Sequence, residues 1–162
     1  VSKKHEDLFE KINEYSDILF IFPLYVDSIP AVFTAFLKSL EEYKIDIKPT
    51  IHVLINCGFI ESEQNFIAVE IIKFFARQNG YPFGSTLCIG GGEAIMGTPF
   101  AFLAKRKIKK FANSINNGKK SFYTVTMPLT KKLFIKASTN YWIKYGERNG
   151  ITREEMETMK IE

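Results

Sequence analysis

The chain alternates between short apolar runs and longer segments whose apolar residues recur every three or four positions. The apolar runs lie at residues 18–22, 50–56 and 86–90. Runs of this length and composition predict strands that are buried on both faces, as in parallel sheets. The segments with helical spacing lie at about residues 30–40, 63–78 and 100–116. This repeated order of strand, loop and helix predicts an α/β fold with a parallel sheet.

Capping and breaking residues locate several ends of these elements. A short amphipathic helix is expected at residues 4–15, ahead of the first strand. Pro30 suits the first turn of a helix, because its missing N–H would have no helical partner there. Ser62 is placed to cap the helix at residues 63–78, and Asn79-Gly80 ends that helix.

The pattern changes in the last part of the chain. One helix face there is apolar and rich in aromatic residues, and it comprises Leu133, Phe134, Ala137, Tyr141, Trp142 and Tyr145. A second short helix should follow Gly150, where Thr152 and Glu155 have capping-box spacing. We therefore predict an α/β domain at residues 1–117 and a helical extension at residues 118–162 that packs on the same domain.

Composition narrows the class of protein. With 162 residues, 46% of them apolar, the chain can bury a substantial core without disulfides or metals. Its apolar runs are too short to cross a bilayer, and its first residues do not resemble a signal peptide. We expect a cytoplasmic protein whose two cysteines, Cys57 and Cys88, are reduced and buried.

Charge is distributed unevenly. Acidic residues exceed basic ones by four in residues 1–81, whereas basic residues exceed acidic ones by eight in residues 82–162. The densest basic run, Lys105–Lys110, should form the outer face of the helix at residues 100–116. No nucleic-acid signature accompanies this run, so a solvated surface is the favoured interpretation and we expect neither a nucleic-acid nor a membrane partner.

Several kinds of catalytic site lack the residues they need. The only histidines are His5 and His52, so the sequence has too few histidines to suggest a metal cluster or a Ser-His-Asp triad. His52 lies inside a predicted strand and is interpreted as structural. Cys57 could be a redox thiol, but neither a Cys-x-x-Cys partner nor a basic activator lies near it in the sequence.

The loop that follows the first strand is the leading candidate site. In parallel α/β sheets, ligands bind beyond the carboxyl ends of the strands. Residues 23–28, Pro-Leu-Tyr-Val-Asp-Ser, occupy that position. Two interpretations stay open there: Pro23 and Pro30 can serve only as turn and helix-start residues, and Tyr25 can belong to the core or contact a ligand.

The order of these motifs resembles that of flavodoxin-like NAD(P)H-dependent FMN reductases. The likeness rests on Ser16-Asp17, Pro23-Leu24-Tyr25, Ile29-Pro30, Phe36-Leu37-Lys38, Asn56-Cys57-Gly58-Phe59 and the strand at residues 87–92. It implies a flavodoxin-like three-layer sandwich, an FMN cofactor, and NAD(P)H as substrate. The implied partners are a nicotinamide cofactor and a small-molecule or flavin acceptor. Because FMN carries the chemistry, no side-chain catalyst is implied.

The resemblance also implies which residues face the flavin. Backbone groups of residues 24–28 would approach the edge of the isoalloxazine ring, and residues 56–60 would flank it, with Gly58 permitting close approach. The implied cofactor-binding residues are Pro23, Leu24, Tyr25, Val26, Asp27, Ser28, Asn56, Cys57, Gly58 and Phe59. For Gly58, a simple turn is the alternative interpretation.

The same resemblance exposes a difference from the family pattern. In that family the FMN phosphate is held by the loop after a first strand, and the sequence before Asp17 predicts only a helix. We therefore expect the sheet to lack its first βα units and the strand at residues 18–22 to form an apolar edge. An upstream segment, a partner or a second copy should cover this edge, and we expect a homo-oligomer. A cofactor-free assembly or interaction module is the alternative function.

Overall fold

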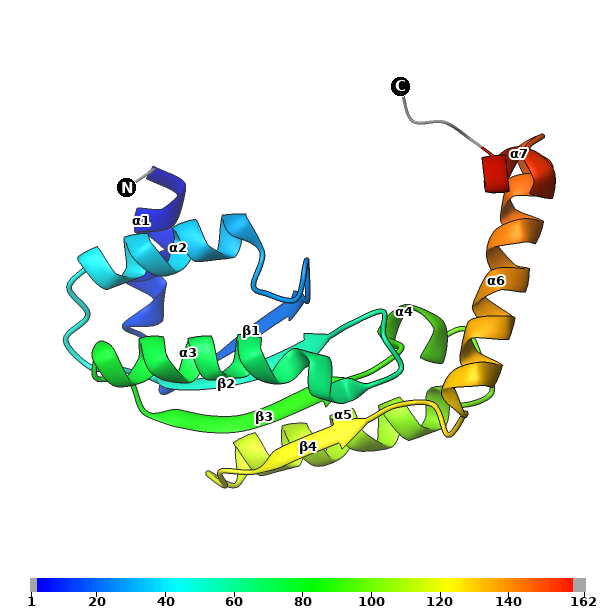
Figure 1. Ribbon diagram of the computed structural model, residues 1–162. Helices are drawn as coiled ribbons and strands as arrows, with labels where there is room; N and C mark the ends of the chain where they lie inside the picture. Colours follow the sequence, from blue (N-terminus) through cyan, green and yellow to red (C-terminus); the bar gives the residue numbers. More distant parts are fainter. Residues whose placement is uncertain (1–2, 159–162) are drawn as a thin grey trace. The chain divides into compact units, whose positions relative to one another are not determined.

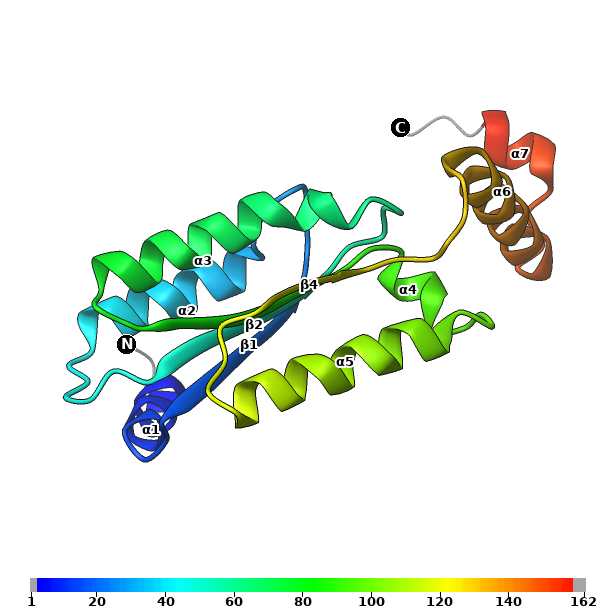
Figure 2. The ribbon, with the colours of Figure 1, turned by 90° about the horizontal axis from the view of Figure 1, so that it is seen from below.

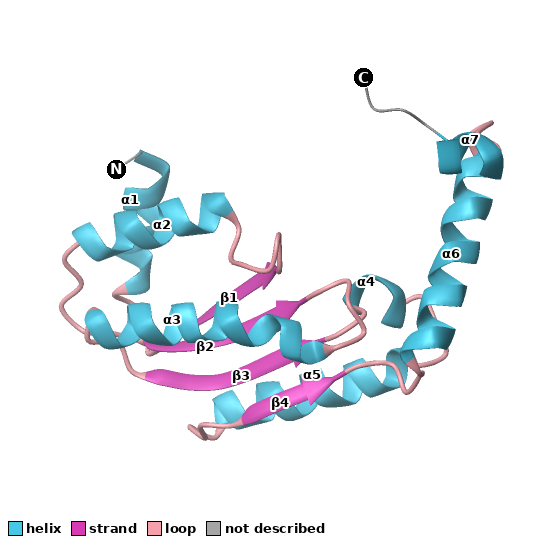
Figure 3. Ribbon diagram, in the orientation of Figure 1, coloured by secondary structure: helices cyan, strands magenta, loops and turns pink. Residues whose placement is uncertain are grey.

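Four strands in the described part of the chain form a single parallel sheet. A computed structural model describes the backbone of residues 3–158 and the side chains of residues 7–158. The strands are β1 (Asp17–Pro23), β2 (Thr50–Asn56), β3 (Phe83–Ile89) and β4 (Phe122–Val125). They lie side by side in the order β1-β2-β3-β4 (Figure 3). The predicted α/β fold is confirmed.

Helices connect successive strands and cover both faces of the sheet. α2 (Ala31–Glu42) and α3 (Phe66–Gln78) lie on one face, and α5 (Ala101–Asn116) lies on the other (Figures 1 and 2). α1 (Lys3–Ile12) precedes β1, and a single turn, α4 (Gly92–Ile95), precedes α5. The layers are those of a flavodoxin-like three-layer sandwich. Because the strand order is sequential, no reversal of strand order occurs among the described strands.

Aromatic side chains fill the core between the sheet and the first helices. The Phe9 ring of α1 lies 5.5 Å from the ring of Phe36 and 5.1 Å from that of Tyr43. The Phe20 ring of β1 meets the Phe33 ring of α2 edge-on at 5.0 Å. These contacts tie α1, α2 and the inner side of β1 into one core.

The opposite face of the sheet is covered only in part. α5 buries Ala104, Phe111 and Ser114, and its contacts are with β3 and β4. On the same face, Leu19 and Ile21 of β1 remain 43% and 64% exposed. The face of the sheet at β1 therefore presents apolar side chains to solvent.

The basic residues of α5 lie where the sequence predicts them. Lys105, Arg106, Lys109 and Lys110 are exposed. Lys107 is half-buried, and its ammonium group lies 5.8 Å from the centre of the Tyr123 ring of β4. Ile108 of the same helix is 37% exposed.

Two predicted boundaries are wrong. We placed the start of the helical extension at residue 118, whereas the sheet continues through β4 and the compact units divide between Met127 and Pro128. β4 escapes the sequence pattern because it has four residues and only Val125 among them is buried. Ser62 does not cap a long helix; it is buried in a 3₁₀ turn, η1 (Ser62–Asn65), and α3 begins only at Phe66.

The described residues of the second unit form two helices, α6 (Lys131–Arg148) and α7 (Arg153–Thr158). The predicted capping box of α7 is confirmed. The Thr152 N–H donates to Glu155 Oε2 at 2.7 Å, and the Glu155 N–H donates to Thr152 Oγ1 at 3.2 Å. The rings of Tyr141, Trp142 and Tyr145 contact one another on α6. No helix in the described part of the chain has the length and apolarity that crossing a bilayer requires.

Candidate functional site

The carboxyl ends of β1, β2 and β3 bring three loops together at one edge of the sheet. The Leu24 N–H donates to the Asn56 carbonyl at 2.8 Å, which joins the first loop to the end of β2. The Cys57 N–H donates to the Ile89 carbonyl at 3.0 Å, which joins the second loop to the end of β3. These loops contain the residues that the sequence predicts to bind a cofactor.

The first loop is a tight turn with an unusual backbone. Tyr25 and Ser28 exchange two backbone hydrogen bonds of 3.0 and 2.9 Å. Between them, Val26 and Asp27 have φ angles of 47° and 55°, a left-handed pair as in type I′ turns. A β-branched residue such as Val is strained in this region, and such strain concentrates at functional sites. Val26 is 99% exposed and Tyr25 is 60% exposed, so neither belongs to the core.

Cys57 anchors the second loop from inside. Its thiol is buried, lies 3.5 Å from the Phe59 carbonyl, and accepts a hydrogen bond of 3.3 Å from the Asn65 side chain. Burial raises the pKa of the Cys57 thiol, which disfavours the reactive thiolate. Both Cys57 and Cys88 are free and buried. Cys57 can therefore offer a ligand its backbone but not its sulfur.

The glycine turn after β3 holds the second loop in place. The Gly91 N–H donates to the Phe59 carbonyl at 2.5 Å, and the Gly92 N–H donates to the Cys57 carbonyl at 2.9 Å. A Cβ atom at Gly92 would overlap the Asn56 side chain, so this close approach requires glycine. These contacts use only carbonyl groups of the second loop, and the Gly58 N–H donates to none of the described residues.

Several backbone donors at this edge have no partner in the chain. Among the described residues, none accepts a hydrogen bond from the N–H of Val26, Asp27 or Gly58. A Cβ atom added at Gly58 would meet nothing within 4 Å, so the space beside that residue is open. The side chains of Tyr25 and Phe59 are exposed nearby in the chain. Free amides and aromatic rings fit the acceptor-rich edge and flat face of an isoalloxazine ring.

The same loops do not fit a phosphate group. Residues 24–30, 57–65 and 90–100 contain no Lys or Arg. They do contain Asp27, Glu61, Glu63 and Glu93, whose negative charges would repel a phosphate. The basic residues of α5 lie on its outer face and not in these loops. The described residues can therefore contact a flavin ring but provide no cradle for its phosphate.

The predicted site residues divide into three groups. The side chain of Leu24 packs on the core and Cys57 is buried, so these two can contribute only backbone atoms. Pro23 and Asn56 end their strands, and the remaining predicted residues, Tyr25, Val26, Asp27, Ser28, Gly58 and Phe59, lie on the loops themselves. Three residues that hold the second loop in place were not predicted. The side chains of Asn65 and Thr126 donate to Cys57 Sγ and to the Ile60 carbonyl, and the Gly92 N–H donates to the Cys57 carbonyl. Only the glycine triplet at residues 90–92 is visible as a signal in the sequence.

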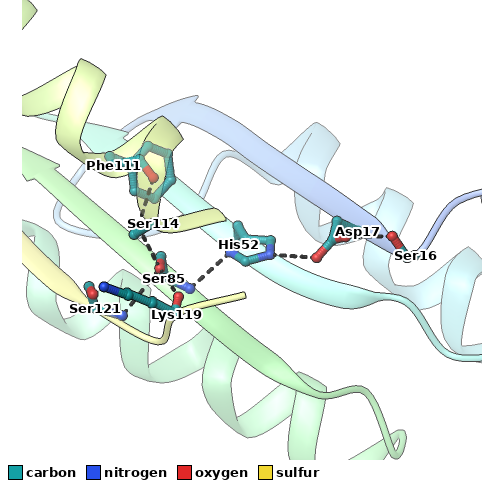
Figure 4. Close-up of polar contacts among 8 residues, drawn as sticks. All are labelled: Ser16, Asp17, His52, Ser85, Phe111, Ser114, Lys119 and Ser121. Atoms are coloured by element: carbon teal, nitrogen blue, oxygen red, sulfur yellow. Dashed lines mark hydrogen bonds and ion pairs between the residues drawn. The ribbon is translucent and has the colours of Figure 1, made fainter. Parts of the chain in front are cut away.

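A second polar cluster crosses the sheet near its other end (Figure 4). The Ser85 N–H donates to His52 Nδ1 at 2.9 Å, so the ring proton lies on Nε2 and donates to Asp17 Oδ1 at 3.0 Å. The Ser85 hydroxyl donates to the Lys119 carbonyl at 2.6 Å, and the Ser114 hydroxyl lies 2.8 Å from Ser85 Oγ. This cluster links three strands to α5.

The bonding of His52 gives it a structural role. Both ring nitrogens are occupied and the side chain is 2% exposed, so His52 has no atom free to bind a metal or accept a substrate proton. Hydrogen bonds from Ser16 and from His52 lower the pKa of Asp17. In the described part of the chain, no group of three His, Cys, Asp or Glu residues could hold a metal ion.

The chain matches no family model, no curated protein and no solved structure. Its function is therefore argued from the residues and the geometry described above.

Proposed function

We propose that this chain forms the ring-facing part of an FMN site in an NAD(P)H-dependent oxidoreductase. The observation that carries the proposal is that the N–H groups of Val26, Asp27 and Gly58, on two loops at the carboxyl ends of β1 and β2, lack acceptors among the described residues. Tyr25 and Phe59 of the same loops have exposed side chains. The position of these loops at the carboxyl ends of parallel strands supports the assignment.

The roles of the residues follow from what each leaves exposed. The N–H groups of Val26 and Asp27 would donate to the ring edge, and Tyr25 would pack beside the ring. Gly58 would let the second loop approach the ring closely, since no side chain intervenes. The chemistry that a bound FMN supplies is the transfer of hydride equivalents from NAD(P)H to a small-molecule or flavin acceptor. The chain itself binds and orients the ring.

Flavin titration tests this proposal. FMN and riboflavin are added separately to the protein, and the quenching of flavin fluorescence gives the two dissociation constants. Because the loops offer ring contacts and no phosphate cradle, we expect the two constants to agree within about tenfold, or ~1.4 kcal/mol. Bleaching of the bound flavin by NADH or NADPH then tests the oxidoreductase activity.

Gly58→Ala provides a specific variant for this titration. The added methyl group meets no atom of the chain within 4 Å, so the free energy of unfolding should be unchanged. The methyl group would enter the space assigned to the ring, and we expect flavin binding to weaken at least about tenfold. Binding that is unaffected by Gly58→Ala would contradict the placement of the ring.

A cofactor-free assembly module is the second candidate function. The exposed apolar edge of the sheet at β1 favours it, because such an edge invites pairing with another strand. A protein that binds neither flavin and consumes no NAD(P)H would reject the oxidoreductase and leave this candidate standing.

A further inference from the structure

The outer edge of β1 is an open edge of the sheet. Among the described residues β1 pairs with β2 alone, and the strand occupies one end of the order β1-β2-β3-β4 (Figure 1). Its seven residues carry one charge, Asp17, at the first position. Proteins usually block such an edge with internal charges, prolines or bulges, because unpaired backbone groups bind other strands. β1 has none of these between Ile18 and Phe22.

The backbone direction identifies which groups are unpaired. The Leu24 N–H donates to Asn56, and the Ser16 carbonyl accepts from Thr50. Even-numbered residues therefore point their backbone groups toward β2, and the alternating odd-numbered residues point outward. The outward residues are Asp17, Leu19, Ile21 and Pro23. Pro23 has no N–H, so the edge offers three donors and four acceptors.

The side chains beside these groups are apolar on both faces of the sheet. Leu19 and Ile21 are exposed on the face that α5 leaves uncovered. Leu54 of β2, the register partner of Ile21, lies beside them. A groove of about 550 Å³ follows the edge, and its walls include Leu8, Tyr15, Leu19 and Ile21 together with the charged residues Lys11 and Asp17. Most of the lining is apolar, so the groove suits a strand that is apolar on both faces, as β1 itself is.

We propose that the β1 edge binds the β1 edge of a second copy of this chain in antiparallel orientation. With Leu19 opposite Ile21 of the second copy, each such pair exchanges two hydrogen bonds. At each end of the interface the Pro23 ring faces the Asp17 carbonyl of the second copy, so the strands separate there and the hydrogen bonds are those of the two Leu19–Ile21 pairs. The Leu19 and Ile21 donors all find acceptors, and the two Asp17 carboxylates lie at opposite ends of the interface. The edge is thus complementary to itself, as a twofold-symmetric dimer requires.

This arrangement joins the two sheets into one continuous sheet. It also brings Leu19, Ile21 and Leu54 of both copies together on one face, which removes apolar surface from water. The proposal does not depend on flavin binding, since none of these residues lies in the loops of the candidate cofactor site.

Two measurements on the purified full chain test the proposal. Sedimentation or light scattering gives the oligomeric state, and residue-resolved amide exchange reports on the edge. We expect a dimer in which the Leu19 and Ile21 amides become protected as concentration rises. The Phe20 and Phe22 amides, which point to β2, serve as internal references and should be protected at every concentration. A monomer whose Leu19 and Ile21 amides exchange rapidly at high concentration overturns the proposal and leaves the groove to a strand of a different chain.

Ile21→Lys and Ile67→Lys form a matched pair of variants. Both residues are isoleucines that are 64% exposed, but Ile67 lies on α3, away from the edge. Ile21→Lys places a charge at both symmetry-related positions and removes two isoleucine side chains that the dimer would bury. We therefore expect the affinity of the dimer to fall at least about a hundredfold. Ile67→Lys should leave the affinity unchanged. Equal effects of the two substitutions, or a dimer that survives Ile21→Lys, also overturn the proposal.

Discussion

At the scale of single residues, the buried imidazole of His52 connects elements that are distant in the sequence. Its two nitrogens bond to Asp17 and Ser85, which lie 35 and 33 residues away along the chain. Burying a polar ring is unfavourable unless both nitrogens are paired, so the position of His52 depends on both partners. The sequence predicts a structural histidine, but it offers no local signal for partners that only the folded sheet brings near.

Asp17→Asn should reduce the acid sensitivity of the protein. Because hydrogen bonds from Ser16 and His52 lower the pKa of folded Asp17, its carboxylate stabilises the fold above the unfolded-state pKa of about 3.9. This stabilisation is lost as the pH falls through the lower folded pKa. We expect the free energy of unfolding to fall less steeply below about pH 4 in Asp17→Asn than in the wild type. Urea titrations over this pH range measure both slopes, and identical slopes would contradict the assigned role of Asp17.

Gly84→Ala should destabilise the sheet through the same histidine. A Cβ atom at Gly84 would overlap the His52 ring and the Thr50 side chain. We expect the free energy of unfolding to fall by about 1–3 kcal/mol, the usual range for overpacking a core. Gly58→Ala is the matched control because its added methyl group meets no neighbour. Equal denaturation midpoints for the two variants would show that the His52 ring can move aside.

At the scale of elements, the turn at residues 25–28 stores strain that a substitution can release. Val26 has a left-handed backbone, which is strained for a β-branched residue. Its side chain is fully exposed, so no packing contact offsets this strain. Asn tolerates this conformation, and Val26→Asn should raise the free energy of unfolding by about 1 kcal/mol. Thermal or urea unfolding measures the change.

Val32→Asn is the control for this prediction. Val32 is also highly exposed, at 81%, but it lies in the ordinary helical backbone of α2, where Val and Asn have similar propensities. Its substitution should leave stability nearly unchanged. If Val32→Asn stabilised the protein equally, the effect at Val26 would come from replacing an exposed apolar side chain with a polar one and not from relief of backbone strain.

The elements differ in how far the sequence predicts them. Long periodic segments such as α3 and α5, and continuous apolar runs such as β1, follow directly from their patterns. β4 does not, because a four-residue edge strand has too few buried positions to form a pattern. Ser62 misled the prediction because its side chain is buried in η1 and makes no cap bond. For the site, proximity to the carboxyl ends of strands was predictable, whereas the left-handed turn at Val26 was not, since Val rarely adopts it.

At the scale of the whole molecule, the chain divides into two compact units, and the unfolding of each unit can be followed by a probe of its own. Trp142, the single tryptophan, lies in the second unit, and the buried residues of β3 lie in the first. Small units bury a smaller fraction of their surface, so we expect the second unit to unfold at lower denaturant concentration. Trp142 fluorescence and amide exchange in β3 measure the two transitions. Coincident transitions would contradict independent unfolding of the units.

The sequential order of the strands has a consequence for synthesis on the ribosome. Chains fold from the N-terminus as they emerge, so β2, β3 and β4 can each add to an edge that is already in place. The growing edge of the sheet advances from β2 to β4, while the outer edge of β1 is present once β1 and β2 have paired. Nascent chains on one messenger RNA can therefore present this edge to each other long before either is released.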